Sequence, residues 1–288
     1  MADSVEVSIV IPTRNGGERL GRCLEAIRGQ RTEHRFEVLC VDSESNEESL
    51  AIMRRHGVRI EPIPVVEFDH GLTRDLGARL STGRALVFVN QDAVPCNDTW
   101  LERLVEPLFA EERWDAVQGG IRSLPPGQCF FWDSTEARFH FTRDMRRWVE
   151  RYGGIGFSTV NAAIRRSAWE KLPFGPAVIM EDKKWQAAAR RAGLEITSRP
   201  RAAVFHSHDY DWRSLARRCR AEGVGWRIVG ERYSLRDVFA DLAAPHVYRQ
   251  WLRAMRHGRI RSAAELFYPW IRPIMLHVGN RSAEGVEP

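Results

Sequence analysis

The sequence predicts an α/β fold with a mainly parallel central sheet flanked by helices, followed by a C-terminal helical extension. Three observations lead to this prediction. In the first half of the chain, short apolar segments rich in β-branched residues alternate with segments of helical periodicity. Their spacing suits right-handed strand–helix–strand units, which build parallel sheets. The last quarter shows helical periodicity only. We therefore expect one domain over residues 1–212 and a helical extension over 213–288.

The first half contains the clearest elements. The run VSIVIP at 7–12 is short, apolar and ended by proline, which is typical of a buried strand. In Glu18–Gln30 the apolar residues fall at helical spacing. The other expected strands are 36–41, 58–63, 85–90 and 115–118, and the other expected helices are 47–56, 72–80 and 99–109.

The second half is less regular. Residues 123–129 (SLPPGQC) read as a loop, and the glycines at 153–156 indicate a flexible link. The expected strands are 160–164 and 202–206, and the expected helices are 134–152, 166–171, 180–192, 212–232, 235–257 and 260–278. Pro269 and Pro273 are expected to break the last of these helices.

The composition is that of a soluble globular protein. The 288 residues are 43% hydrophobic and 28% charged, with five scattered cysteines and no C-x-x-C pair. This use of cysteine is typical of reduced thiols in the cytoplasm. No apolar run approaches the length of a membrane-spanning helix, and the first residues lack the pattern of a secretory signal.

The positive charge is concentrated in the extension. Residues 213–288 hold 14 Arg and seven acidic residues, whereas residues 1–212 hold 29 basic and 31 acidic residues. The extension also contains Trp226, Trp251 and Trp270 among its arginines. Helices of this composition bind the inner face of a membrane peripherally, or they pack against the rest of the chain or a second subunit. Both interpretations remain open.

Polar residues follow three of the expected strands, at Thr13-Arg14-Asn15, Asp42-Ser43 and Gln91-Asp92. Ligands bind parallel sheets at the carboxyl ends of the strands, so the three groups point to one crevice. Neither G-x-G-x-x-G nor G-x-x-x-x-G-K-[ST] follows the first strand. Dinucleotide binding and P-loop phosphate binding are therefore disfavoured.

Several residues could carry out chemistry in that crevice. Asp92 could ligate Mg²⁺ or Mn²⁺ that holds a diphosphate. His206 and His208 are alternate residues of an extended segment, so one of the two could reach such a metal. Glu181-Asp182 opens a helix, either as a dipole-matched cap or as a general base. Trp185 could be a platform for a ring-shaped acceptor, and Arg74 could neutralise a phosphate.

The segments VSIVIPTRNGG, VDSES, FDHGLTRDLGA, VNQDA, MEDKKW and VFHSH, in this order, resemble glycosyltransferase family 2. The resemblance covers residues 5–210 and is nearest to the rhamnosyltransferase-like branch. It implies a nucleotide-diphospho-sugar transferase fold of the GT-A type, an inverting reaction and a divalent metal, Mg²⁺ or Mn²⁺.

The resemblance also implies roles for individual residues. Pro12, Thr13 and Asn15 line the nucleoside site, with Arg14, Ser43 and Gln91 beside them, and Asp42 meets the base. Arg74 and Asp75 lie near the diphosphate or the sugar. Asp92 is the last carboxylate of the family's D-x-D metal motif, His206 completes the metal site, and Asp182 is the base of the E-D motif. The chain departs from the family at Asn90, where Asp is usual, and at Asp75, where the rhamnosyl branch has Asn.

The function expected from this resemblance is transfer of a sugar to a hydroxyl of a glycan or lipid-linked acceptor. Rhamnose on a thymidine diphosphate is the indicated donor, and UDP-linked sugars remain open. A noncatalytic nucleotide-sugar binder and a nucleotidyltransferase are the alternatives. Nucleic acid is not expected as a partner, because no reading module appears and residues 1–212 are slightly acidic.

Overall fold

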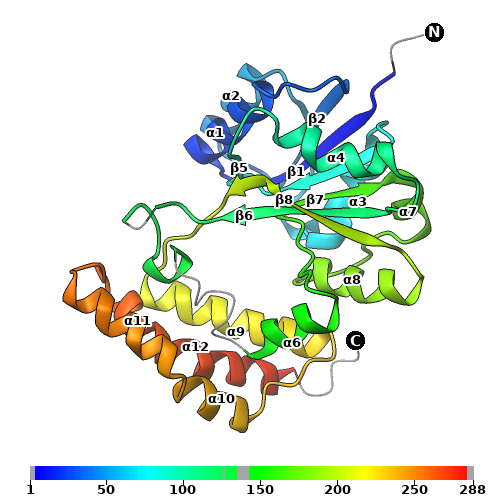
Figure 1. Ribbon diagram of the computed structural model, residues 1–288. Coiled ribbons are helices and arrows are strands. Elements are labelled where there is room, and N and C mark those ends of the chain that lie inside the picture. The colour runs from blue at the N-terminus through cyan, green and yellow to red at the C-terminus, as the bar shows by residue number, and fades with distance from the viewer. Residues whose placement is uncertain (1–3, 126, 135–142, 284–288) are drawn as a thin grey trace. The chain divides into compact units, whose positions relative to one another are not determined.

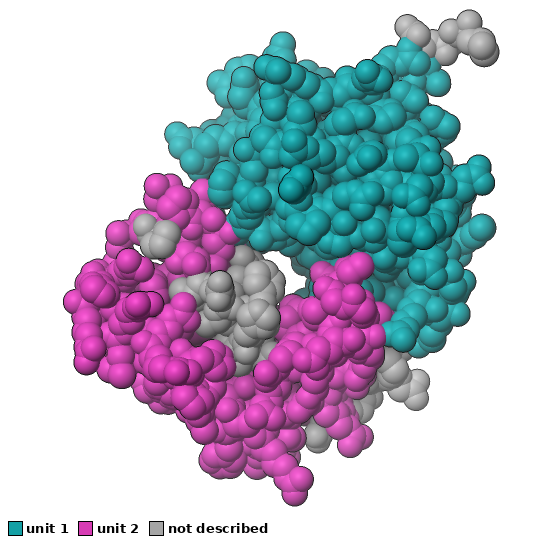
Figure 2. Space-filling model, in the orientation of Figure 1, with its two compact units in different colours: residues 1–122, 157–206 teal, residues 123–156, 207–288 magenta. Residues whose placement is uncertain are grey.

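The computed structural model describes residues 4–125, 127–134 and 143–283 (Figure 1). It divides into two compact units (Figure 2): unit 1 comprises residues 1–122 and 157–206, and unit 2 comprises 123–156 and 207–288. The expected domains were 1–212 and 213–288, whereas the structure groups residues 123–156 with those from 207 onward. The chain leaves the sheet after the strand that ends at Arg122 and enters it again with the strand that starts at Asn161.

Unit 1 is built on one eight-stranded sheet in the order β3-β2-β1-β4-β7-β6-β8-β5. Its first four strands are mutually parallel, whereas β7 runs antiparallel to both of its neighbours, β4 and β6. The strands are β1 (Val7–Thr13), β2 (Phe36–Asp42), β3 (Arg59–Pro62), β4 (Ala85–Val89), β5 (Val94–Pro95), β6 (Ala116–Arg122), β7 (Asn161–Arg165) and β8 (Ile196–Phe205). The α/β fold is confirmed, and β5 is a short strand that the sequence analysis missed.

Helices cover both faces of this sheet (Figure 1). Alternate residues of β1 supply the two cores: Val7, Ile9 and Ile11 face one side, and Val10 faces the other. The first core includes α1 (Gly17–Arg28), α2 (Glu47–Arg55) and α4 (Trp100–Ala110). The second core includes α3 (His70–Leu80), α7 (Arg166–Lys171) and α8 (Glu181–Arg191), while the 3₁₀ turn η1 (Val65–Glu67) precedes α3.

Two glycines set the position of α3 against its neighbours. A Cβ at Gly77 would lie 2.3 Å from Val10 Cγ1, and one at Gly71 would lie 2.0 Å from the carbonyl oxygen of Gly175. Both distances are far shorter than any van der Waals contact, so only glycine lets the helix approach the sheet and the 172–177 loop this closely. The part of α3 between these glycines is thereby fixed close to this face of the sheet.

Unit 2 is helical. Its elements are η2 (Phe131–Ser134), α6 (Arg143–Arg151), α9 (Trp212–Ile228), α10 (Leu235–Leu242), α11 (Pro245–Arg256) and α12 (Ala263–Ser282). The expected helix at 235–257 is two helices, because Pro245 starts a new helix at its first turn. Part of the expected helix at 134–152, residues 135–142, lies outside the described residues.

The expected break of the last helix at its prolines is wrong, since α12 runs through both. A proline within a helix leaves the carbonyl four residues before it without its usual donor. For Pro269 that carbonyl belongs to Glu265, and the indole Nε1 of Trp132 donates to it at 2.6 Å. A side chain from η2 therefore replaces the missing backbone hydrogen bond and keeps the helix intact.

The helices α9 and α12 cross at two glycines. A Cβ at Gly223 would lie 2.0 Å from the carbonyl oxygen of Leu276, and one at Gly279 would lie 1.9 Å from that of Arg220. Close approach of the two backbones here depends on the absence of side chains. Within the described residues, no helix has both the length and the apolar character needed to cross a bilayer.

Candidate active site

Hydrogen bonds join the three polar groups at the carboxyl ends of β2, β1 and β4. The hydroxyl of Thr13 donates to Asp42 Oδ1 at 2.9 Å. The backbone N–H of Arg14 donates to Gln91 Oε1 at 2.9 Å, and Gln91 Nε2 donates back to the Arg14 carbonyl at 3.0 Å. The structure therefore brings together at one sheet edge the residues that the sequence placed there.

Asp42 organises the loop that follows β2. It is buried, and its carboxylate accepts hydrogen bonds from Thr13 and from both the N–H and the hydroxyl of Ser45. Ser43 donates its N–H to the Thr13 carbonyl at 2.9 Å, and its buried hydroxyl has no hydrogen-bond partner among the described residues. Asn15 completes the link, since its Oδ1 accepts from the N–H of Asn46 at 2.8 Å.

Backbone strain is concentrated beside the predicted site residues. Among the described residues, only Asn15, Glu44 and Met180 combine a side chain with a positive φ, at 47°, 56° and 57°. Each follows or precedes a residue that the sequence singled out. A left-handed backbone costs about 1–3 kcal/mol outside glycine, and it persists where the surroundings fix it, often at functional sites. Met180 is the residue immediately before α8.

Two predicted metal ligands lie together. The imidazole Nε2 of His206 is 3.4 Å from Asp92 Oδ1. The backbone N–H of His206 donates to the Arg122 carbonyl at 2.8 Å. Within the described part of the chain, no group of three or more His, Cys, Asp or Glu residues could hold a metal. A carboxylate and an imidazole are suitable ligands for a divalent cation that takes its remaining ligands from a diphosphate and water.

His208 has a different environment. It belongs to unit 2, where the carboxylate of Asp133 accepts its backbone N–H at 3.0 Å and contacts its Nδ1 at 3.1 Å. This pairing holds the imidazole against η2. Of the two histidines that the sequence left open, His206 is the one placed against Asp92.

The motif FDHGLTRDLGA forms a clasp between α3 and the loop at 172–177. Asp69 caps α3 through the N–H groups of Gly71 and Leu72, and it also accepts from the N–H of Ala177. Asp75 is buried, and the Trp169 indole and two backbone N–H groups donate to it at 2.7–3.0 Å. The expectation that Asp75 contacts the diphosphate or sugar is therefore corrected: its carboxylate anchors this loop.

Arg74 connects α3, α8 and the end of β4. Its guanidinium lies 3.2 Å from the carboxylate of Glu181 and donates at 2.9 Å to Asn90 Oδ1. The hydroxyl of Thr159 donates to the same Glu181 oxygen at 2.6 Å. The position where the family has a metal-binding Asp thus holds an amide that accepts from Arg74. Thr159 was missed because an isolated threonine carries no recognisable pattern.

Glu181 is held ionised in this pair. Burial by itself would raise the pKa of Glu181, but the charges of Arg74 and His70 and the hydrogen bond from Thr159 outweigh it. Its pKa therefore lies below the usual value. Because Glu181 is buried and fully engaged, its predicted catalytic role is corrected to a positioning role: it fixes the start of α8.

Asp182, the next residue, is oriented differently. Its side chain remains 15% exposed, and it accepts from the N–H of Lys183 at 2.7 Å. The Lys183 ammonium is 3.2 Å from the other Asp182 oxygen and also donates to the carbonyl of Phe157. Met180, with its left-handed backbone, immediately precedes α8, whose first turn holds the buried Glu181 and the partly exposed Asp182.

Trp185 is not a platform for an acceptor. The residue is 1% exposed, its indole packs against Phe157 and Phe174, and its Nε1 donates to the Leu172 carbonyl at 2.8 Å. The helical spacing that made it a candidate reflects the core face of α8. This prediction is corrected.

A hollow of about 460 Å³ opens beside Asp92 and Gln91. Two exposed arginines of α1, Arg19 and Arg22, also line it. The sequence analysis missed both because they read as the solvated face of an amphipathic helix. The other lining residues are Asn15, Gly16 and Glu18.

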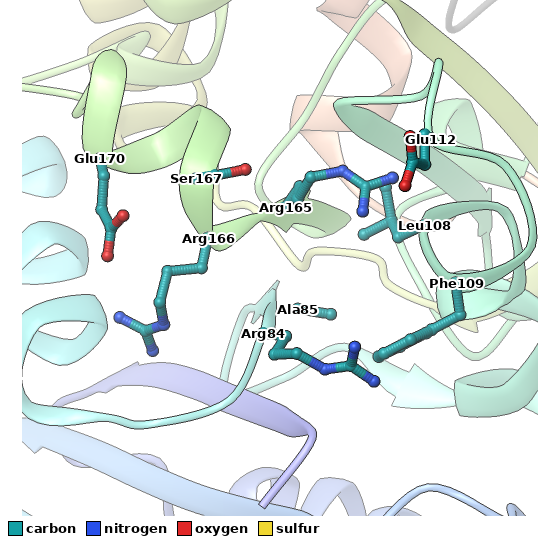
Figure 3. Close-up of a pocket in the computed structure, with 9 residues that line it drawn as sticks. All are labelled: Arg84, Ala85, Leu108, Phe109, Glu112, Arg165, Arg166, Ser167 and Glu170. Carbon is teal, nitrogen blue, oxygen red and sulfur yellow. The ribbon is translucent and has the colours of Figure 1, made fainter.

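A second pocket, of about 390 Å³, lies near the opposite end of β4 (Figure 3). In Figure 3 the side chains of Arg84 and Arg165 run toward the side of Leu108 and Phe109, whereas that of Arg166 runs the opposite way. Arg165 and Arg166 donate to backbone carbonyls at 2.6–3.2 Å, so they hold loops together. This pocket is therefore distinct from the candidate active site.

Comparison with known proteins assigns the family. Residues 8–173 match the family described as glycosyl transferase family 2. The chain belongs to this family. The match includes the joined strand ends and the α3 side of the clasp, and the protein is accordingly a glycosyltransferase, as predicted.

Relatives of this glycosyltransferase include O-antigen chain rhamnosyltransferases. It is 28% identical to RfbN of Salmonella typhimurium, with 76% of this chain and 72% of the relative covered. It is 29% identical to WbaN of Salmonella anatum, over 75% and 71%. A solved structure of glucosyl-3-phosphoglycerate synthase from Mycobacterium tuberculosis, in complex with Mn²⁺, UDP and phosphoglyceric acid, aligns with a TM-score of 0.59. It is 18% identical over 78% of this chain and 76% of that chain, and it supports the GT-A fold.

Proposed function

We propose that this glycosyltransferase transfers rhamnose from a nucleoside diphosphate to a hydroxyl of a glycan or lipid-linked acceptor, with inversion at the anomeric carbon. The single observation that carries the proposal is the geometry of unit 1. The strand ends at Thr13, Asp42 and Gln91 are joined into one edge, and Asp92, which follows Gln91, pairs with His206 at the end of β8. The O-antigen chain rhamnosyltransferases among the relatives support rhamnose as the sugar.

The nucleoside is assigned to the edge formed by β1 and β2. Pro12, Thr13 and Asn15 would contact it, with Asp42 and the unpaired Ser43 hydroxyl as hydrogen-bonding groups. The exposed guanidinium of Arg14 would lie near the negative charge of the diphosphate. Thymidine and uridine diphosphates present the same pattern of donors and acceptors on the pyrimidine edge, so both belong in the binding test.

Asp92 and His206 would hold Mg²⁺ or Mn²⁺ at the diphosphate. A metal at this place acts as a Lewis acid that neutralises the charge of the leaving nucleoside diphosphate. Asn90 carries an amide in place of a carboxylate, and the oxygen of that amide accepts from Arg74. The chain therefore offers one carboxylate and one imidazole, and the nucleotide would complete the ligand set.

Asp182 is the proposed general base. It would accept the proton of the acceptor hydroxyl while the oxygen attacks the anomeric carbon and the diphosphate leaves from the opposite face. One displacement of this kind inverts the configuration. Lys183 holds the carboxylate in place, and the buried Arg74–Glu181 pair fixes the helix that carries it.

The Asp182→Asn substitution tests this role. The amide keeps the shape and cannot accept a proton, so we expect turnover to fall by at least about 10²-fold while donor binding is retained. Product formation would be followed by mass spectrometry, and donor binding by calorimetry. The matched control is Asp98→Asn, which alters an exposed carboxylate paired with Arg31.

Three results would decide against the proposal. Weaker nucleotide binding with unchanged turnover in Asp182→Asn would move this residue from catalysis to donor binding. Donor binding without transfer to any glycan acceptor in the wild-type protein would favour the noncatalytic alternative. Release of pyrophosphate from a nucleoside triphosphate would favour the nucleotidyltransferase alternative.

A further inference from the structure

We propose that the outer face of α10, α11 and α12 in unit 2 docks onto an anionic lipid bilayer. The inference is independent of the sugar-transfer proposal, because binding of this kind needs no nucleotide. Three features support it: the arrangement of side chains around α11, the exposed apolar residues of the neighbouring helices, and a segment that contains arginines but no acidic residue.

Helix α11 has three parallel stripes, each with members three or four residues apart and thus on one face. The first stripe, Val247, Trp251 and Ala254, belongs to the core cluster of unit 2. The other two lie successively farther around the helix. One is apolar and contains Tyr248, Leu252 and Met255, and the other contains Arg249, Arg253 and Arg256.

The apolar stripe is open to solvent. Leu252 is 48% exposed and Met255 is 45% exposed, although both could have been polar at no cost to the core. Tyr248 is half-buried, and its ring lies 5.9 Å from the ring of Trp270 in α12. An apolar stripe flanked by arginines, with Tyr and Trp beside it, is the pattern of a helix lying in a membrane interface.

Helix α12 extends this surface. Phe267, 51% exposed, packs against Trp270, and Ile274 and Val278 follow on the same exposed face. In Figure 1, α12 lies between α9 on one side and α10 and α11 on the other. Helix α10 adds Leu235 and Phe239, of which Phe239 is 68% exposed. Exposed apolar side chains gathered on adjoining helices mark an interaction surface.

Charge identifies the partner. Residues 242–264 hold five arginines and no Asp or Glu. Arginine side chains can lie along the interface while their guanidinium groups reach lipid phosphates, and each contributes about 1 kcal/mol near an anionic surface. A second copy of this chain would bring the same arginines to a two-fold interface, where like charges repel. Nucleic acid would leave the apolar stripe exposed. An anionic bilayer offers apolar acyl chains to the apolar stripe and phosphate groups to the arginine stripe.

The test is flotation of the full-length protein with vesicles made of equal parts phosphatidylglycerol and phosphatidylcholine. We expect the wild-type protein to float with these vesicles and not with pure phosphatidylcholine. The triple variant Arg249→Ser/Arg253→Ser/Arg256→Ser is expected to bind about 100-fold more weakly, from about 1 kcal/mol per arginine. A second variant, Leu252→Ser/Met255→Ser, should also bind more weakly, without changing the charge.

The matched control is Arg28→Ser/Arg55→Ser/Arg103→Ser, which removes the same charge from exposed positions of unit 1. Its flotation should equal that of the wild type. Equal loss in the two triple variants would overturn the proposal, since net charge alone would then explain binding. Equal flotation with uncharged vesicles would overturn it too. A dimer that forms without lipid and is abolished by Leu252→Ser/Met255→Ser would assign the surface to a second copy.

Discussion

At the scale of single residues, Arg74 is the charge on which the site depends. It is 3% exposed and pairs with the buried Glu181. Its guanidinium also donates hydrogen bonds to Asn90 Oδ1 and to the backbone carbonyl of His70. Its Nε has no hydrogen-bond partner among the described residues, which adds to the cost of burying it. The pair therefore functions to place α8 rather than to add stability, because buried ion pairs are seldom better than apolar packing.

A double-mutant cycle tests this pair. Arg74→Met would leave the Glu181 carboxylate buried without a counter-charge, and we expect it to lower the free energy of unfolding by about 3–5 kcal/mol. Arg74→Met/Glu181→Gln should be less destabilised than Arg74→Met alone, because no buried charge remains. Urea denaturation at pH 7 measures these two variants together with Glu181→Gln and the wild type, which complete the cycle. Simple additivity of the two single substitutions would show that the residues do not interact.

Residue roles were only partly predictable from the sequence. The polar groups at Thr13, Asp42 and Gln91 were found because parallel strands end at one edge. Asp75 and Trp185 were assigned to ligands, yet both are buried with protein partners. A sequence shows that a residue is polar or aromatic, but only the fold shows which direction it faces. The departure from the family at Asn90 was visible in the sequence, but the hydrogen bond that Asn90 accepts from Arg74 was not.

At the scale of elements, α9 and α12 are held by a cluster of charges next to their glycine crossing, in which Arg272 is buried. Glu222 of α9 pairs with Arg272 of α12 and with Arg218 one turn earlier on its own helix. Burial by itself would raise the pKa of Glu222, but Arg272 and Arg218 lower it to about 2. The carboxylate therefore stays ionised in the folded protein well below the pH at which it would be protonated in the unfolded chain.

This shift predicts how stability depends on pH. A carboxyl group with a lowered folded-state pKa stabilises the protein above its unfolded pKa of 4.5, and the contribution is lost as the pH falls toward about 2. Glu222→Gln should be less stable than the wild type at pH 7, and the difference should shrink as the pH falls through this range. Glu150→Gln, at an exposed position of α6, is the control. A constant difference between pH 7 and pH 3 would contradict the prediction.

The helix boundaries illustrate what local rules can and cannot predict. The expected helix at 235–257 runs across Pro245, where the structure starts a new helix. The opposite error was made in α12, which continues through its prolines because Trp132, more than 130 residues away in sequence, donates to the carbonyl of Glu265. Local sequence patterns therefore predict whether a segment is a helix or a strand. Whether a helix continues past a proline depends on distant residues that hydrogen-bond to its free backbone carbonyl groups.

At the scale of the whole molecule, the order of strands and helices up to β4 was predictable, because β1, β2, β3 and β4 are parallel strands joined by single α-helices. Beyond this point the sheet becomes mixed: β7 enters antiparallel, and β8 pairs with β6 and the missed β5. The segment 123–156 joins unit 2 by contacts with residues after 207. Such long-range grouping leaves no periodic signal in the sequence.

The metal and nucleotide sites can be separated on the intact protein by thermal unfolding. A ligand that binds only the folded state stabilises it, by about 2.7 kcal/mol at a hundredfold excess over Kd. We expect thymidine or uridine diphosphate to raise the Tm, and Mn²⁺ to increase that shift, because Asp92, His206 and the diphosphate would share the ion.

Asp92→Asn should abolish the Mn²⁺-dependent part of the Tm shift and keep the nucleotide-dependent part, whereas Asp98→Asn should keep both parts. A metal-dependent shift that survives in Asp92→Asn would place the cation elsewhere. No shift with any nucleotide would remove the donor site from the joined strand ends.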